Sequence, residues 1–78
     1  MKDRRYKFFT IKQDGDMEAH PFYRINSNKS NEELGVICWC AEWRQFTFDP
    51  DGFSSWSADC LAGIIEFLNE LNKENAEC

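Results

Sequence analysis

The stretch Leu34–Phe67, LGVICWCAEWRQFTFDPDGFSSWSADCLAGIIEF, contains most of the unusual residues of this chain. It holds all three tryptophans, three of the four cysteines and four of the seven phenylalanines. Residues 34–41 are apolar on both faces of an extended chain, which is typical of a central strand. Residues 45–48 predict a second strand, because Phe46 and Phe48 share one face and aromatic residues favour a pleated sheet. The short connection between these segments indicates a tight hairpin.

An amphipathic helix is predicted after these strands. Asp49-Pro50-Asp51-Gly52 predicts a turn, since proline sets φ and glycine closes the turn. Ser57 is a good N-cap, so we expect a helix from about Ala58 to about Glu74. Apolar residues recur there at helical spacing, namely at Leu61, Ile64, Ile65, Leu68 and Leu71. Gly63 costs about 1 kcal/mol against alanine in mid-helix, so we expect it to allow close packing on the sheet.

The chain before this stretch predicts a hairpin. Residues 5–13 are aromatic, β-branched and basic, which favours a strand. Asp14-Gly15-Asp16 is a strong turn signal between apolar segments, and residues 17–25 are then the returning strand. Pro21 lacks an amide hydrogen, so it places the returning strand at a sheet edge or predicts a break in it.

These elements predict an α+β fold of the order β-β-β-β-α. We expect a small antiparallel sheet of three to four strands, followed by one C-terminal amphipathic helix packed on one face. Seventy-eight residues form one domain, covering residues 1–78, with a frayed tail from about residue 74. The second face of the sheet is then either covered by loops or exposed as an interaction surface.

Composition narrows the classes of partner. The net charge of −5 disfavours duplex DNA and anionic membranes. Bases gather in the first twelve residues and acids gather beyond Asp49, which indicates a dipolar surface. No apolar segment approaches the ~20 residues needed to span a bilayer. The N-terminus has no export signal, so we expect a cytoplasmic location, where disulfides are rare.

The residues that could carry chemistry disfavour an enzyme. The possible metal ligands are His20, Cys38, Cys40, Cys60 and Cys78. Cys38 and Cys40 are spaced Cys-x-Cys on a strand and lack the second pair of a zinc site, so we interpret them as core cysteines. His20 is the only histidine, and its place before a proline is typical of a turn. We therefore predict no catalytic residue, no metal and no cofactor.

Two charged segments suggest opposite kinds of partner. The first interleaves basic and aromatic side chains, and its candidate residues are Arg4, Arg5, Tyr6 and Lys7. Such a strand can stack unpaired bases and contact phosphates, so single-stranded nucleic acid is one alternative. The acidic helix face, with Glu66 and Glu70, offers negative charge to a nucleic-acid-handling protein instead. For both segments, an ordinary solvated surface is the simpler interpretation.

The central stretch carries the pattern W-x3-W-R-Q-aromatic-x-F-x-P, followed by C-L-x2-I-x2-F. Its positions are Trp39, Trp43, Arg44, Gln45, Phe46, Phe48, Pro50, Cys60, Leu61, Ile64 and Phe67. In this pattern the chain resembles a group of small proteins encoded in phages and prophages, over less than half of its length. That group has no assigned biochemical activity. The resemblance implies a mobile-element accessory protein.

The predicted function is a non-enzymatic protein-interaction module that binds a host or phage protein, such as a host defence or nucleic-acid-processing factor. Its predicted binding residues are Trp43, Arg44, Gln45, Glu66 and Glu70. Tryptophan and arginine are common interface anchors. The alternative is that Trp43 closes one end of the core and Arg44 stacks on it. A homodimer through edge strands or an aromatic face is a further alternative.

Overall fold

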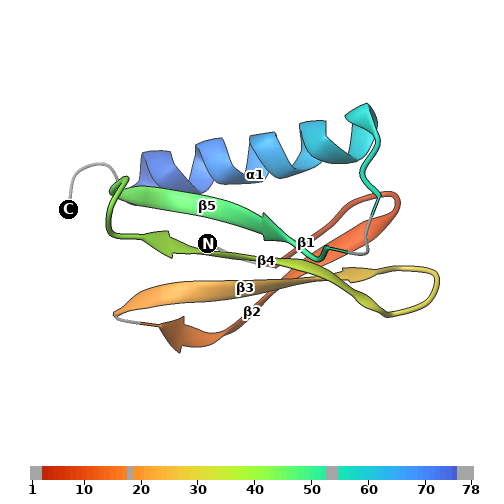
Figure 1. The fold of residues 1–78 in the computed structure, drawn as a ribbon, viewed down its shortest axis with the longest axis horizontal. Helices are drawn as coiled ribbons and strands as arrows, with labels where there is room; N and C mark the ends of the chain where they lie inside the picture. The colour runs from red at the N-terminus through yellow and green to blue at the C-terminus, as the bar shows by residue number, and fades with distance from the viewer. Residues whose placement is uncertain (1–2, 18, 53–54, 76–78) are drawn as a thin grey trace.

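The computed structural model describes residues 3–17, 19–52 and 55–75. Its elements, in chain order, are β1 (Arg4–Arg5), β2 (Phe9–Met17), β3 (His20–Ser27), β4 (Glu33–Cys40), β5 (Gln45–Pro50) and α1 (Ala58–Asn75). The strands form one antiparallel sheet in the order β1-β2-β3-β4-β5, as Figure 1 shows. The α+β fold with one C-terminal helix is confirmed, with five strands in place of three to four. The tail predicted to fray lies largely outside the described residues.

The predicted strand 5–13 is divided in two by a tight turn. The Tyr6 N–H donates to the Phe9 carbonyl at 2.7 Å, which reverses the chain between β1 and β2. The Asn28 side-chain amide donates to the carbonyls of Tyr6 at 2.7 Å and of Lys7 at 3.3 Å. The prediction of one continuous strand is wrong, because an amide from the loop after β3 stabilises a turn that its own aromatic residues do not signal.

The predicted hairpin turn at Asp14–Asp16 is instead part of β2. Pairing between β2 and β3 shifts between Gln13 and Asp16 and resumes at Asp16 opposite Pro21, so this segment forms a β-bulge. Of the two alternatives predicted from Pro21, the sheet edge is wrong for the strand as a whole, since β3 lies between β2 and β4. The break is confirmed, because β2 ends at Met17 and β3 begins at His20. Strand β3 pairs with β4 from Tyr23 onward, so Pro21 lies before the paired region. The N–H that proline lacks therefore costs no hydrogen bond to β4.

The helix begins and packs as its sequence predicts. Ser57 caps it, because the Ser57 Oγ accepts a hydrogen bond from the Cys60 N–H at 3.2 Å. A Cβ added at Gly63 would lie 3.1 Å from the Phe9 ring, which confirms the close packing expected there. The core lies between the helix and one face of the sheet. It consists of Phe9, Ile11, Tyr23, Ile25, Ile37, Phe46, Ile64, Phe67 and Leu71.

The helix is attached to both edges of the curled sheet. At the β5 edge, the Asn72 Oδ1 accepts a hydrogen bond from the Phe46 N–H at 2.6 Å, and the Asn72 Nδ2 donates to the Phe46 carbonyl at 3.4 Å. At the β1 edge, the Arg4 guanidinium donates to both carboxylate oxygens of Glu70, at 2.6 and 2.9 Å. Figure 1 shows α1 along β5, with the β1–β2 hairpin rising toward it. The helix therefore closes the open side of the sheet.

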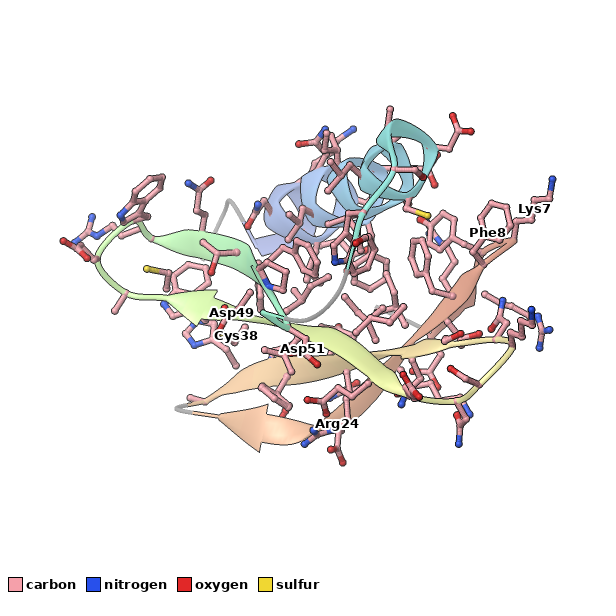
Figure 2. The ribbon with its side chains drawn as sticks, turned by 45° about the vertical axis from the view of Figure 1, so that its right-hand side comes forward. Lys7, Phe8, Arg24, Cys38, Asp49 and Asp51 are labelled. Atoms are coloured by element: carbon pink, nitrogen blue, oxygen red, sulfur yellow. The ribbon has the colours of Figure 1, made fainter. Side chains whose placement is uncertain are left out.

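The opposite face of the sheet is polar and is not covered by a helix. Arg24 projects from this face, as Figure 2 shows, and forms ion pairs with Asp14 at 2.8 Å and with Glu33. Cys38 and Thr47 are half-buried there, and the Thr47 hydroxyl donates to the Cys38 carbonyl at 3.4 Å.

Candidate protein-binding groove

A groove of about 310 Å³ lies between β5 and α1. Its lining residues are all uncharged, and they are Trp43, Gln45, Phe46, Thr47, Phe48, Ile65, Leu68, Asn69 and Asn72. Two large apolar side chains that line it are open to solvent, since Trp43 is 67% exposed and Ile65 is 56% exposed. Exposed apolar surface next to a hollow is typical of an interaction site.

The turn between β4 and β5 places Trp43 at this groove. Residues 41–44 form that turn, and Arg44 has a φ of 54°, in the left-handed region that few non-glycine residues adopt. The exposure of Trp43 shows that its ring does not close an end of the core. Within the described part of the chain, no cation–π contact joins Arg44 to Trp43. Of the predicted binding residues, Trp43 and Gln45 line the groove, and Arg44 is exposed beside them.

The groove also runs along a free strand edge. Strand β5 pairs with β4 on one side only. Phe46 turns its N–H and carbonyl away from β4, where Asn72 binds both. Antiparallel ladders alternate in this respect, so Phe48 directs its N–H and carbonyl to the same edge. Asn72 already occupies the Phe46 backbone groups, so the groove combines apolar side chains with the backbone groups of Phe48, with which an extended segment can pair.

The sequence patterns did not single out the helical side of this groove. Ile65 and Leu68 were interpreted as core, yet Ile65 lies about 100° around the helix from the buried Ile64. The signal available was the width of the apolar stripe, which extends past the face that one sheet can bury. Asn72 carried no signal, since its role depends on the position of the Phe46 backbone.

Two of the predicted protein-binding residues lie on the other side of α1, where they meet the predicted nucleic-acid-binding residues. Arg4 contacts Glu70 and also approaches Glu66 at 3.3 Å. The Tyr6 hydroxyl donates to the Glu66 Oε1 at 2.9 Å. The hydrogen bond from Arg4 lowers the pKa of Glu70, and burial is the largest cause of the raised pKa of Tyr6. The acidic and basic candidates therefore have a structural partner in each other.

The remaining basic candidates are exposed. The Lys7 ammonium lies 5.3 Å from the centroid of the Phe8 ring, and that ring is 53% exposed. Figure 2 shows both side chains pointing outward at the end of the β1–β2 hairpin. Arg5 lies on β1 and is also exposed.

The interpretation of Cys38 and Cys40 as core cysteines is wrong, because both alternate with the buried Ile37 along β4 and neither belongs to the buried core. Cys38, Cys40 and Cys60 are free and half-buried, and burial is the main cause of the raised pKa of the Cys38 thiol. His20 stacks on Trp39 with ring centroids 4.2 Å apart and an angle of 2° between the ring planes. Across residues 3–17, 19–52 and 55–75, no three histidine, cysteine or carboxylate side chains gather closely enough to hold a metal ion.

The chain matches no protein-family model, no curated protein and no solved structure with which it was compared. Among the described residues, no helix has the length and apolar character needed to cross a membrane.

Proposed function

We propose that this chain is a non-enzymatic protein-interaction module that binds an extended segment of a partner protein in the groove between β5 and α1. The observation that carries the proposal is the pair of exposed apolar residues, Trp43 and Ile65, in an uncharged groove along the outer edge of β5. Tryptophan is a frequent hot-spot residue at protein interfaces. A free edge strand accepts an added strand through its backbone.

The resemblance to small phage and prophage proteins suggests the source of the partner. We propose a host protein, such as a defence or nucleic-acid-processing factor, met in the cytoplasm of the host cell. The lining residues carry no charge, so the segment that enters the groove is expected to be apolar and extended.

The test compares two sets of exposed apolar residues. The protein is immobilised, proteins are captured from a bacterial lysate, and each captured protein is identified, purified and titrated by calorimetry. The variant Trp43→Ser/Ile65→Ser removes the apolar groove residues, and Phe8→Ser is the matched control, since Phe8 is similarly exposed elsewhere. We expect the groove variant to bind at least about tenfold more weakly, and the control to bind as the wild type does. Equal binding by all three proteins would contradict the proposal.

A second copy of this chain is an alternative occupant of the groove. Light scattering across a range of concentrations separates the two cases. A dimer that dissociates in the Trp43→Ser/Ile65→Ser variant but not in Phe8→Ser would assign the groove to self-association.

Single-stranded nucleic acid is the second candidate, and one observation favours it. Phe8 is an exposed ring with the Lys7 ammonium above it, close in sequence to the exposed Arg5. Aromatic and basic side chains in this arrangement suit a base and its phosphate. A fluorescence titration with an oligonucleotide at low salt tests it, with the two variants in reversed roles. Binding must then be lost in Phe8→Ser, retained in the groove variant and weakened by salt.

A further inference from the structure

A second hollow, of about 380 Å³, opens on the face of the sheet opposite α1. Its floor is a row of residues across three strands, because Arg5 of β1 pairs with Thr10 of β2 and Thr10 pairs with Asn26 of β3. Lys12 follows Thr10 on the same face, since side chains alternate along a strand. Arg5 and Lys12 therefore both border one hollow.

The two cations of this hollow have no carboxylate partner in the described part of the molecule. The neighbouring arginines differ in this respect, since Arg4 pairs with Glu66 and Glu70, and Arg24 pairs with Asp14 and Glu33. No acidic residue lines the hollow. Two cations around one hollow, with no acid among its described lining residues, give it a positive potential that favours an anion.

The polar groups around the cations are held in place by one another. The Thr10 hydroxyl donates to the Asn28 Oδ1 at 2.5 Å, and the Asn26 amide donates to the Asn31 carbonyl at 3.2 Å. The Ser27 Oγ accepts from the backbone N–H groups of Lys29 at 3.2 Å and Ser30 at 3.3 Å. The Asn26 Nδ2 carries a second hydrogen, which can donate to a ligand on this face.

We propose that this hollow binds a phosphate group, with Arg5 and Lys12 as its charged ligands and the Asn26 side-chain amide as a neutral donor. The guanidinium offers a planar fork to two phosphate oxygens, and the ammonium supplies a point charge. The same group occurs in inorganic phosphate, in small phosphate esters and in a nucleic-acid backbone. The site is separate from the groove between β5 and α1, so it does not depend on the function proposed above.

The test is an NMR titration of the ¹⁵N-labelled protein with sodium phosphate, compared with sodium chloride at equal ionic strength. We expect saturable shifts of the backbone amides at Thr10, Asn26 and Ser27 with phosphate only. Arg5→Gln and Lys12→Gln should each weaken binding roughly fivefold or more, because each removes a charged hydrogen bond. Lys12→Arg keeps the charge and should retain binding.

The matched control is Arg44→Gln, which removes one exposed positive charge outside the hollow. The proposal is overturned if chloride causes the same shifts, or if Arg44→Gln weakens phosphate binding as much as Arg5→Gln does.

A second titration uses a short oligothymidylate. Tighter binding than inorganic phosphate, with the same dependence on Arg5 and Lys12, assigns the phosphate to a nucleic-acid backbone. Equal or weaker binding assigns it to a small phosphate compound.

Discussion

The side-chain amide of Asn72 takes the place of a neighbouring strand at one residue of β5. Its oxygen accepts from the Phe46 N–H and its nitrogen donates to the Phe46 carbonyl. A primary amide carries the same donor and acceptor as a peptide group, so it can satisfy both backbone groups of an edge residue. Phe46 is buried, and an unpaired backbone group beside it would be costly.

Replacing this amide should therefore destabilise the protein. We expect Asn72→Ala to lower the free energy of unfolding by about 1–2 kcal/mol, because it leaves the Phe46 N–H and carbonyl without their partners. Urea denaturation measures the change. Asn69→Ala is the control, since Asn69 is exposed on the same helix and should change stability by less than about 0.5 kcal/mol. An equal loss of unfolding free energy in the two variants would show that the Asn72 amide does not stabilise the protein through the Phe46 backbone groups.

At the scale of the element, α1 has two unlike sides flanking its buried stripe. One side carries Glu66 and Glu70, which bind β1 through Arg4. The other side carries Leu61 and Ile65, which are 39% and 56% exposed. The first side therefore attaches the helix to β1, whereas the second carries exposed apolar residues beside Asn72, which attaches the helix to β5.

The ion pair between Arg4 and Glu70, called the acidic clasp below, should make stability depend on pH. Arg4 lowers the pKa of Glu70 in the folded protein below the value of about 4.3 usual for an unfolded chain. A lowered folded pKa stabilises the protein fully above the unfolded value, and this stabilisation is lost as the pH falls through the folded pKa. Urea midpoints measured between neutral pH and about pH 3 should therefore fall more steeply below pH ~4.3 in the wild type than in Arg4→Gln.

The control for this titration is Arg44→Gln, which removes the same charge where the described residues provide no ion pair. Its midpoints should follow the wild-type slope. If Arg4→Gln and the wild type lose stability in parallel on acidification, the clasp does not contribute to the acid response.

At the scale of the whole molecule, the sheet and the helix share one core. Phe67 is fully buried and packs edge-to-face on Tyr23, with ring centroids 5.2 Å apart. A domain of 78 residues has a total stability of only about 4–12 kcal/mol. The strands thus depend on side chains from the last element of the chain, and the sheet is not expected to persist without them.

Truncating the central helical side chain tests that dependence. Phe67→Ala should cost about 3–5 kcal/mol and leave much of the protein unfolded. Near-ultraviolet circular dichroism and thermal melting measure the loss. Ile65→Ala, two positions away and more than half exposed, should keep the wild-type melting transition to within a few degrees. A cooperative melt of Phe67→Ala near the wild-type temperature would show that the sheet folds independently.

The elements governed by local rules were the ones that the sequence predicted well. The helix, its Ser57 cap and the central strand β4 follow from periodicity and capping, which act over a few residues. The break after β1 depends on Asn28, 22 positions from Tyr6, and the aromatic residues around it favour a strand. The bulge in β2 uses the same Asp-Gly signal as a hairpin turn, so local chemistry does not distinguish them.

The candidate site was predicted only at its turn. Trp43 and Gln45, which line the groove, were predicted as binding residues because a Trp-Arg-Gln segment at a strand connection can be partly exposed. Glu66 and Glu70 were read as a free acidic face, since their pairing with Arg4 joins residues 62 and 66 positions apart. Arg5 and Lys12 line one hollow only because β1 and β2 fold back on each other.

The attachment of α1 to both sheet edges has a consequence for the time course of folding. The meander pairs strands that are neighbours in sequence, whereas the clasp of Arg4 to Glu70 closes a separation of 66 residues. Contacts that close long loops tend to form after local hairpins. Weakening such late contacts speeds unfolding and leaves the folding rate nearly unchanged. We therefore expect the contacts of α1 with Arg4 and with Phe46 to govern how long each molecule stays folded, and the hairpins to govern how quickly it folds.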